Sequence, residues 1–522
     1  MAPLTWLTVI LALSTCDAFK ILTINPIPSK SHGILGDGII RHLLNAGHEV
    51  TSILAFPKKD PHPNLTQVIP ESNHKLFNEN YINIKAIMDK ETDFLNFDFK
   101  LQLLTNLSIS TVQDDNVQKL LRDPTQSFDV IVGEWMFAEL YSTFSALYDC
   151  PFIWFSTLEP HWLVLRLIDE HFNPAYTTDY TASYIPPYSF GKRIEQLWKQ
   201  ITGKRCMANF RPFEEIEKQV YHSSIVPILR ERGKTVPAFE DLIYNTSLML
   251  GNSHVSLGLA PRIPQSYKPI GGFHIDANVN PLPEDLKIIL DNAKHGVIYF
   301  SMGSNLKSKD IPQSLKEGFL DIFSGLKQTI LWKLEEVLPN LPKNVHILTW
   351  APQQSILAHP NVVLFITHGG ILSTTEAIHF AKPIIGVPVF ADQFGNVDKA
   401  VHKGFARRVD LAYDMDKELK IEINEILGNP NYARKAKEWS FIYHDRPVTP
   451  GQELVHWVEH IIKTRGGSHL RSAALLVPWY QKLYLDLLAL IIAIVFILGV
   501  GLKVLLGQVI TEGKGREKKK SV

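Results

Sequence analysis

Residues 362–379 combine a buried strand, two glycines and a helix start in an order that suits a bound anion. The apolar run 362–366 predicts the strand, Gly369 and Gly370 follow it, and a helix is predicted to begin near Ser373. Glycines let a ligand approach the backbone, and the first turn of a helix offers free N–H groups and a positive dipole end. His368 and the Ser373 hydroxyl would add two donors, so the segment predicts a diphosphate site.

Carboxylate and amide side chains follow where the hydroxyl groups of a ligand could bind. Glu376 lies one helical turn after Ser373 and can accept hydrogen bonds from a ribose. Asp392 and Gln393 follow the next predicted strand and suit the hydroxyls of a sugar. The order predicts contacts to a diphosphate, a ribose and a hexose, although an isolated His368 would more often cap a helix or pack in a core.

Two strand–loop–helix units are expected to position these side chains. The first unit has a strand at 20–25, a helix at 33–45 and a second strand at 50–56. The second unit begins with a strand at 296–300, and further buried strands are expected at 345–349, 362–366 and 383–387. The pattern predicts an α/β fold of two tandem Rossmann-like domains, with a cleft at the carboxyl ends of their parallel strands. The Pro- and Gly-containing stretch 261–283 is the expected linker.

The first glycine cluster argues against a dinucleotide cofactor. Gly33, Gly36 and Gly38 are spaced GxxGxG, whereas the dinucleotide fingerprint is GxGxxG. The strand at 50–56 also ends without the acidic residue that would hold an adenosine ribose.

Residues 365–393, taken whole, resemble the signature of the UDP-glycosyltransferase family, and the insect microsomal members most. The matching residues are Thr367, His368, Gly370, Ser373, Glu376, Pro383, Pro388, Asp392 and Gln393, preceded by Trp350-Ala351-Pro352-Gln353. The resemblance extends over nearly the whole chain and implies the two-domain GT-B architecture, a UDP-sugar as co-substrate and no other cofactor.

The resemblance also implies a role for each donor-site residue. Trp350 would stack on the uracil, Gln353 would contact the uridine, and Glu376 would bind the ribose. Arg262 would reach the nucleotide, and the remaining positions would contact the phosphates or the transferred sugar. The full expected donor set is Ser301, Gly303, Ser304, Trp350, Gln353, His368, Gly370, Ser373, Glu376, Asp392, Gln393 and Arg262. Some relatives have Asn where this chain has Leu372, so that contact must be absent here or replaced by Ser373 and the backbone.

His32 stands where family members carry the catalytic base. An inverting sugar transfer needs a group that removes the proton of the attacking hydroxyl, and a neutral imidazole suits that role near neutral pH. The family usually supplies an Asp at the end of a later strand to orient this histidine, but the run 128–134 places Glu134 there. Glu134 keeps the charge with one more methylene, although a solvated residue at a strand end is the other interpretation.

Both ends of the chain predict membrane targeting. The apolar run 4–13 before a small-residue cleavage motif predicts a signal peptide at 1–18, and the sequons at Asn64, Asn106 and Asn245 would then be glycosylation sites. An apolar segment at 483–506 predicts one transmembrane helix, followed by a basic tail at 507–522.

These ends bracket two expected domains and predict a location. The N-terminal acceptor-binding domain is expected at 19–258 and the C-terminal UDP-sugar-binding domain, with helices that return toward the first, at 259–482. Positive residues mark the cytosolic side, so the body would be lumenal in a single-pass type I protein. The terminal Lys519-Lys520-Ser521-Val522 resembles the dilysine signal of the endoplasmic reticulum membrane.

Composition excludes some other classes of protein. The chain has 522 residues with 53 basic and 53 acidic side chains, which argues against a nucleic-acid binder. The charges are unevenly distributed along the chain, because residues 503–522 hold six basic and two acidic side chains. Three cysteines are too few for a disulfide scaffold, and no metal-ligand spacing stands out. Whether Cys150 and Cys206 pair stays open.

The sequence therefore predicts a membrane-anchored enzyme of detoxification that transfers a hexose, with glucose favoured, from a UDP-sugar to a small lipophilic acceptor. Two alternatives share the donor site: a transferase acting on a membrane lipid, and a catalytically silent homologue that binds a UDP-sugar or a lipophile. The sequence leaves open the acceptor and whether the chain forms a homo-oligomer. Aromatic candidates for the acceptor pocket, which could equally be core residues, are Trp154, Phe155, His161 and Trp162.

Overall fold

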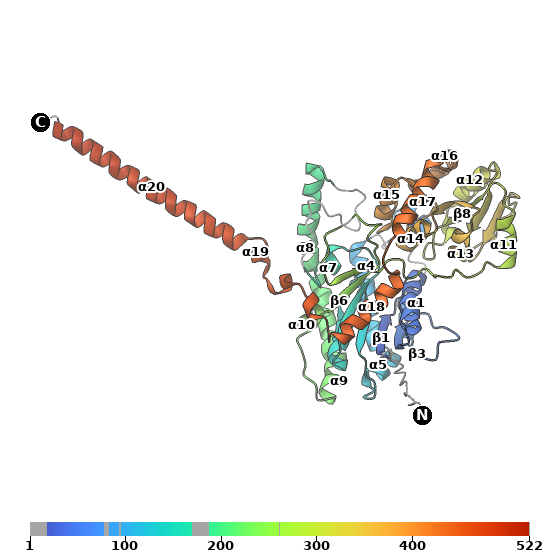
Figure 1. Cartoon of the computed structure of the whole chain (residues 1–522), viewed down its shortest axis with the longest axis horizontal. Coiled ribbons are helices and arrows are strands. Elements are labelled where there is room, and N and C mark those ends of the chain that lie inside the picture. Colours follow the sequence, from blue (N-terminus) through green and yellow to red (C-terminus); the bar gives the residue numbers. More distant parts are fainter. Residues whose placement is uncertain (1–17, 78–82, 93–95, 170–186, 260, 521–522) are drawn as a thin grey trace, which may run out of the picture. The chain divides into compact units, whose positions relative to one another are not determined.

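The computed structural model describes residues 18–77, 83–92, 96–169, 187–259 and 261–520, without the side chains of residues 97, 199–211, 479 and 512–520. It divides into two compact units, residues 1–471 and residues 472–522. Nearly all of the predicted signal peptide lies outside the described residues. The larger unit contains two parallel sheets and carries every predicted site residue (Figure 1).

Seven parallel strands form the N-terminal sheet, in the order β3-β2-β1-β4-β5-β6-β7. Their bounds are β1 Lys20–Asn25, β2 Glu49–Leu54, β3 Leu65–Val68, β4 Val130–Trp135, β5 Phe152–Ser156, β6 Leu248–Gly251 and β7 Tyr267–Pro269. The central strands β4 and β5 are buried along their whole length, as expected for parallel strands covered on both faces. The strand order reverses between β1 and β4, which are direct neighbours.

Six parallel strands form the C-terminal sheet, in the order β10-β9-β8-β11-β12-β13. Their bounds are β8 Val297–Ser301, β9 Thr329–Lys333, β10 Val345–Leu348, β11 Val362–Thr367, β12 Ile384–Gly386 and β13 Ala406–Arg408. The order reverses here between β8 and β11. The predicted α/β fold of two Rossmann-like domains is therefore confirmed.

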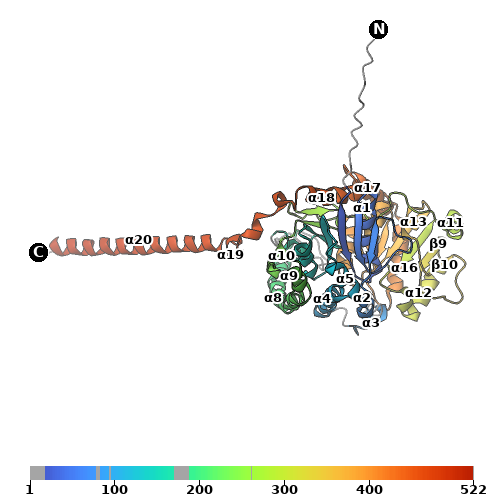
Figure 2. The same cartoon turned by 90° about the horizontal axis from the view of Figure 1, so that it is seen from below.

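Helices cover both faces of each sheet. In the N-terminal half, α1 and α18 pack on one face of the sheet, and α4, α5 and α9 pack on the other (Figure 2). In the C-terminal half, α12 and α16 cover one face, while α11, α13, α14, α15 and α17 cover the other. The N-terminal helices are α1 Lys30–Asn45, α2 Glu71–Leu76, α3 Ile84–Met88, α4 Phe97–Gln113, α5 Asp115–Arg122, α6 Phe144–Tyr148, α7 Trp162–Leu165, α8 Phe190–Val220, α9 Val226–Glu231 and α10 Phe239–Tyr244. The C-terminal helices are α11 Glu284–Asp291, α12 Gln313–Ser324, α13 Gln353–Ala358, α14 Ile371–His379, α15 Gln393–His402, α16 Met415–Gly428, α17 Asn431–His444 and α18 Pro450–Lys463.

Each half sends one helix onto the core of the other. Ile84 and Ile87 of α3 pack into the core of the C-terminal half, and α18 returns to lie beside α1 of the N-terminal half (Figure 1). The N-terminal sheet also extends past the boundary predicted after residue 258, because β7 is its last strand. A strand of three residues, one of them Pro, carries too little pattern to be found in the sequence.

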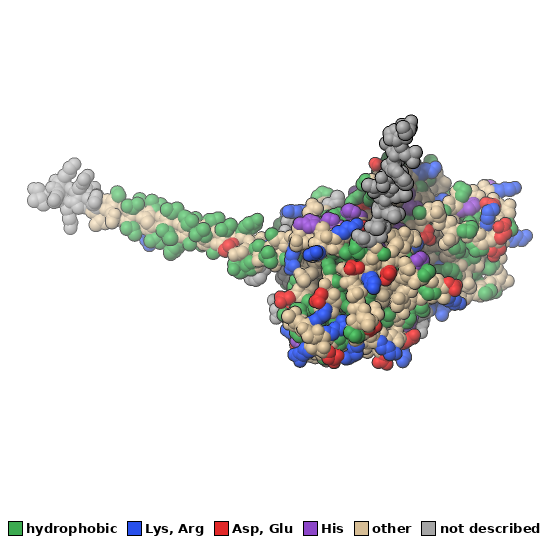
Figure 3. All heavy atoms as spheres, turned by 60° about the horizontal axis from the view of Figure 1, so that its bottom comes forward, with side chains coloured by type: hydrophobic (Ala, Val, Ile, Leu, Met, Phe, Trp, Pro, Cys, Tyr) green, Lys and Arg blue, Asp and Glu red, His purple; other side chains and the backbone are tan. Residues whose placement is uncertain are grey.

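The smaller unit contains α19, Trp479–Lys482, and the long helix α20, Leu485–Lys520. Residues 485–511 make α20 the one helix, among the described residues, that is long and apolar enough to cross a membrane. Its visible surface is dominated by hydrophobic side chains (Figure 3). The helix begins two residues after the start predicted for the span and continues past Lys503.

Candidate active site

The predicted site residues lie at the switch points of the two sheets. His32 follows β1 and Glu134 lies on the neighbouring strand β4, at the reversal in the N-terminal sheet. The loop 301–304 follows β8 and the loop 367–370 follows β11, at the reversal in the C-terminal sheet. Open parallel sheets bind ligands beyond the carboxyl ends of their strands at such points.

His32 lies in the first turn of α1, three residues after the end of the proline-containing loop at 26–29. Its Nδ1 atom contacts Oε1 of Glu134, whose side chain is only 1% exposed. The His32 side chain is 18% exposed and faces a cavity of about 700 Å³. Glu134 is therefore placed to hold the imidazole in the tautomer with hydrogen on Nδ1, which leaves the other ring nitrogen to accept a proton.

The same cavity receives the expected donor-site residues. Its lining includes Ser301, Gly303, Ser304, Trp350, Gln353, His368, Gly370, Ser373, Glu376, Asp392 and Gln393. Arg262 is exposed and does not line the cavity, so the structure gives no support to a nucleotide contact from this residue. The structure brings His32 of the N-terminal half, in contact with Glu134, and the donor residues of the C-terminal half to one cavity.

The N-terminus of α14 opens into the cavity with no acidic residue in its first turn. Gly370 is its N-cap, and Ser373 is buried in the first turn. His368 packs between the loops, because a Cβ atom on Gly303 or on Gly370 would lie 2.5 Å from its ring. Burial, reinforced by the nearby Lys333, lowers the pKa of His368 to about 4, so its imidazole is neutral at neutral pH and can donate one N–H to an anion.

A hydrogen-bonded cluster joins the expected uridine and ribose residues. The amide Nε2 of Gln353 donates to Glu376 Oε2 at 2.6 Å and to Ser373 Oγ at 3.2 Å. Gln354 donates to the other Glu376 oxygen at 3.2 Å, and His274 Nε2 lies 3.5 Å from that oxygen. These contacts fix the buried Glu376 carboxylate at the cavity wall.

Asp392 and Gln393 begin α15 and are also held in place. Asp392 Oδ2 accepts from Asn396 Nδ2 at 2.7 Å, and the Asn396 amide reaches the Gly369 carbonyl at 3.1 Å. Gln393 Oε1 accepts from the backbone N–H groups of Val389 and Phe390. Burial raises the pKa of Asp392, opposed by the Asn396 hydrogen bond. The loop before α15 is thereby coupled to the glycine turn at 369–370.

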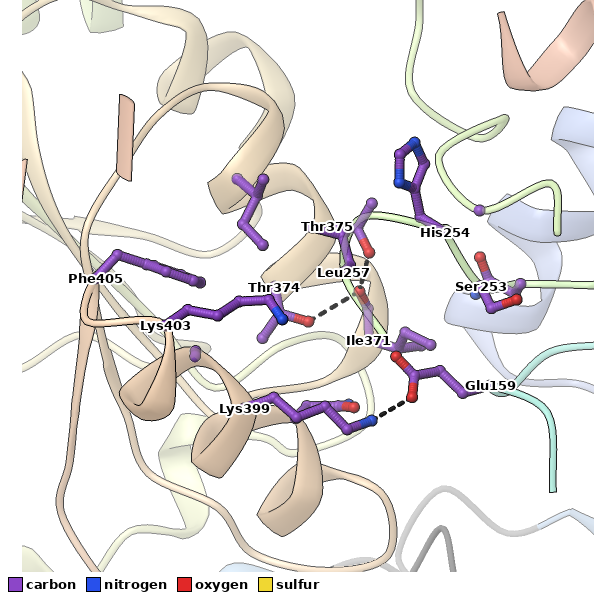
Figure 4. A pocket seen from close by; sticks show the side chains of 15 residues that line it. Glu159, Ser253, His254, Leu257, Ile371, Thr374, Thr375, Lys399, Lys403 and Phe405 are labelled. Atoms are coloured by element: carbon purple, nitrogen blue, oxygen red, sulfur yellow. Dashed lines mark hydrogen bonds and ion pairs between the residues drawn. The ribbon is translucent and has the colours of Figure 1, made fainter. Parts of the chain in front are cut away.

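Several residues that the sequence did not single out connect the two halves around the cavity. Asn305 hydrogen-bonds to Ser29 and Ser31, and Arg41 pairs with Asp276. Behind α14, Glu159 pairs with Lys399 of α15 beside a second, smaller cavity (Figure 4). The sequence could have pointed to Asn305, because this residue directly follows the predicted loop 301–304. Asp276 lies in the stretch predicted as a linker.

Leu372, which stands where some relatives have Asn, contacts both the cavity and the other half. Its side chain lines the cavity and also packs against the apolar core that α1 and α18 form on the N-terminal sheet. Leu372 therefore makes apolar contact with the other half.

The aromatic residues considered for an acceptor pocket do not line the main cavity. Trp154 and Phe155 belong to the two cores of the N-terminal half, and His161 is fully buried. Trp162 packs at the edge of the first of these cores. Within the described part of the chain, no group of three or more His, Cys, Asp or Glu side chains could hold a metal ion.

Two Rossmann-like domains that share a cavity between their switch points make up the GT-B architecture. Solved structures support this fold. The glycosyltransferase of kitacinnamycin has a TM-score of 0.59 and 17% identity, and the alignment covers 86% of this chain and 100% of that one. An Arabidopsis thaliana structure, UGT89C1 complexed with UDP-L-rhamnose, has a TM-score of 0.56 and 15% identity, covering 85% and 100%.

Sequence comparisons assign the family. The sequence model described as UDP-glucoronosyl and UDP-glucosyl transferase matches residues 29–516, and the chain belongs to this family. A UDP-glycosyltransferase of Dactylopius coccus, UGT5, is 30% identical over 96% of this chain and 94% of its own length. The rat UDP-glucuronosyltransferase 2B15 is 26% identical over 94% of each chain. The protein is thus a glycosyltransferase enzyme whose donor substrate is a UDP-sugar.

Proposed function

We propose that this enzyme transfers glucose from UDP-glucose, with inversion, to a hydroxyl group of a small lipophilic acceptor. The observation that carries the proposal is the contact between His32 and the buried Glu134 at the wall of the cavity that the donor residues line. His32 is the general base, and Glu134 orients it.

The bond changes follow from this arrangement. The acceptor oxygen attacks C1 of the sugar as its proton passes to His32, the new O–C1 bond forms, and the bond from C1 to the UDP oxygen breaks on the opposite face. Glu134 stabilises the imidazolium that results. The free N–H groups of α14, with His368 and Ser373, offset the charge that develops on the leaving UDP.

Glucose is favoured over a charged sugar by the charges around the cavity. Asp392 is a half-buried carboxylate that accepts a hydrogen bond from Asn396, so a sugar carboxylate beside it would be repelled. Arg41 and Lys333, the lysine and arginine side chains among the described lining residues, are each paired with an acidic side chain. A Dactylopius coccus relative named UDP-glucosyltransferase 2 is 29% identical over 92% of this chain, which agrees with glucose.

A lipophilic acceptor agrees with the name of another relative. The ecdysteroid UDP-glucosyltransferase of Spodoptera littoralis nuclear polyhedrosis virus is 26% identical over 93% of this chain. Its name specifies a steroid acceptor, so we propose an uncharged lipophilic alcohol or phenol for this enzyme, in a detoxification role.

We further propose that the body lies in the lumen of the endoplasmic reticulum, anchored by α20. The apolar stretch of α20 and the basic residues after it support a type I orientation. The sequon residues Asn64, Asn106 and Asn245 are all exposed, as attachment of a glycan requires.

The proposal is tested with the full-length chain in microsomes, several UDP-sugars, and soluble phenols compared with membrane lipids. We expect acceptor-dependent UDP release with UDP-glucose, and loss of transfer in His32→Ala with UDP binding retained. Unchanged turnover in His32→Ala would refute the base assignment. Asp392→Ala should weaken discrimination between UDP-sugars; unaltered donor preference would remove that role. Transfer only to lipids, or no UDP release with any acceptor, would favour one of the two alternatives.

A further inference from the structure

Three consecutive residues just before His32 contact the donor-binding half. The Ser29 hydroxyl donates to Asn305 Oδ1 at 3.0 Å, and Asn305 Nδ2 donates to the Ser31 hydroxyl at 3.2 Å. Between them, Lys30 Nζ lies 4.7 Å from the centre of the Trp350 ring. The first turn of α1, which carries His32, is therefore attached to the opposite wall of the cavity.

The three polar side chains form a closed hydrogen-bonded ring. Ser29 Oγ and Ser31 Oγ lie 3.1 Å apart, which completes the circle with the two Asn305 bonds. Because the Ser29 hydrogen is used on Asn305, Ser31 donates to Ser29, and each group then donates once and accepts once. A carboxamide suits this arrangement because it supplies a donor and an acceptor on one planar group.

Ser29 uses its hydroxyl in this ring and not in a capping hydrogen bond to its own helix. It is the N-cap of α1, with extended backbone angles, yet its side chain makes no capping hydrogen bond. A serine at this position usually accepts from a free N–H group of the first turn, which stabilises a helix by roughly 1 kcal/mol. The hydroxyl donates instead to Asn305 of the donor-binding half, so this contact takes the place of a capping hydrogen bond.

Asn305 is itself held by the loop expected to contact the phosphates. It follows Ser301-Met302-Gly303-Ser304, and Gly303 has a φ of +85° and packs on the His368 ring. Met302 and Leu306, on either side of this part of the loop, are buried. Movement of this loop upon donor binding would be transmitted through Asn305 to the turn that carries His32.

We infer that Asn305 is a positioning residue, which sets the distance between the base on His32 and the sugar carbon of the bound donor. The inference rests on the proposed function, in which His32 removes the acceptor proton. Glu134 fixes the ring from within the N-terminal half, and Asn305 fixes the start of the helix relative to the donor half. Other contacts, including the Arg41–Asp276 pair, hold the halves together without touching this turn.

The test compares Asn305→Leu and Ser31→Ala in the full-length enzyme, with Asn292→Leu at an exposed position after α11 as the matched control. A misplacement of about 1 Å can cost roughly a hundredfold in rate. We expect kcat to fall about ten- to a hundredfold in Asn305→Leu. We expect the Kd for UDP, measured by calorimetry, to stay within about threefold, since the ring does not include the expected phosphate donors. The double variant Asn305→Leu/Ser31→Ala should be no slower than Asn305→Leu alone, because both changes break one ring.

Asn305→Asp separates positioning from donor binding. Its carboxylate can accept from both serine hydroxyls, so kcat should recover relative to Asn305→Leu, while the added charge raises the KM for the donor. A kcat within about threefold of the wild type in Asn305→Leu, or additive losses in the double variant, would overturn the inference. If His32→Ala keeps its turnover, the proposed function fails instead. If His32→Ala is inactive and Asn305→Leu is normal, only the role of Asn305 fails.

Discussion

Replacing Glu134 with glutamine tests the proposed catalytic pair with the smallest change in shape. The Glu134 side chain is 1% exposed, and its Oε1 atom contacts His32. Its other oxygen is buried and has no hydrogen-bond partner among the residues that the structure describes. Glutamine can keep an oxygen against His32 Nδ1, so Glu134→Gln removes the negative charge and preserves the tautomer.

The expected loss follows from the charge alone. A hydrogen bond to a charged group contributes about 1.5–3 kcal/mol net, against about 0.5–1.5 kcal/mol for a neutral one. Because Glu134→Gln keeps a neutral hydrogen bond, the loss in the transition state is the difference between the two contributions, about 1–1.5 kcal/mol, and kcat/KM falls about five- to twelvefold, at roughly 1.4 kcal/mol per factor of ten. UDP affinity should not change, because Glu134 does not line the cavity.

Stability should respond in the opposite direction to activity. A buried carboxylate with one unpaired oxygen is costly to desolvate, so its neutralisation should leave the unfolding temperature unchanged or raise it. Steady-state rates, UDP calorimetry and thermal unfolding of Glu134→Gln, beside the exposed control Glu284→Gln, measure these quantities. Wild-type turnover in Glu134→Gln would refute the role of the charge, and strong destabilisation would indicate a structural carboxylate.

Three further predictions follow from the site and its surroundings. Trp350 is 56% exposed at the cavity, so Trp350→Ala should weaken UDP binding by the roughly 1–3 kcal/mol of a base–aromatic stack, as measured by calorimetry. Leu372→Asn should tighten UDP binding by up to about tenfold through a new hydrogen bond and lower the unfolding temperature through lost apolar packing; unchanged values of both would contradict this account. Burial lowers the pKa of His254, His368 and His379 from 6.5 to about 4. Their contribution to stability is therefore fully present above pH 6.5 and is lost as the pH falls toward 4. The decline in unfolding temperature over this range should be shallower in a His254→Gln variant than in the wild type.

The elements around the site could be predicted where the sequence pattern is long and apolar. The strands at 20–25 and 362–367 are apolar runs bounded by loops with Pro or Gly, and the structure places them within one residue of the expected bounds. The helix containing Ser373 begins at Ile371, because Gly370 serves as its N-cap. Local pattern and local chemistry agree at these positions, so a single sequence suffices to place them.

Contacts between distant segments could not be predicted in the same way. Asn305 lies 276 residues from Ser29, and Lys399 lies 240 residues from Glu159, with no local pattern to relate them. The three-residue strand β7 was missed for a related reason, since its place in the N-terminal sheet is set by pairing with β6. Such features depend on how the halves pack, which the hydrophobic period of one segment does not encode.

Leu372 and Asn305 both lie where the two halves of the larger unit meet, and their contacts differ in kind. The base belongs to the N-terminal half and the donor residues to the C-terminal half, so neither half holds a complete site. Leu372 contacts the other half by apolar packing, whereas Asn305 does so through hydrogen bonds. Small polar bridges are easier to break and re-form than a large apolar interface, because each contributes only about 1 kcal/mol. The separation of base and donor is therefore adjustable at Asn305 and fixed at Leu372, so substitutions at Asn305 should alter kcat and those at Leu372 should alter stability.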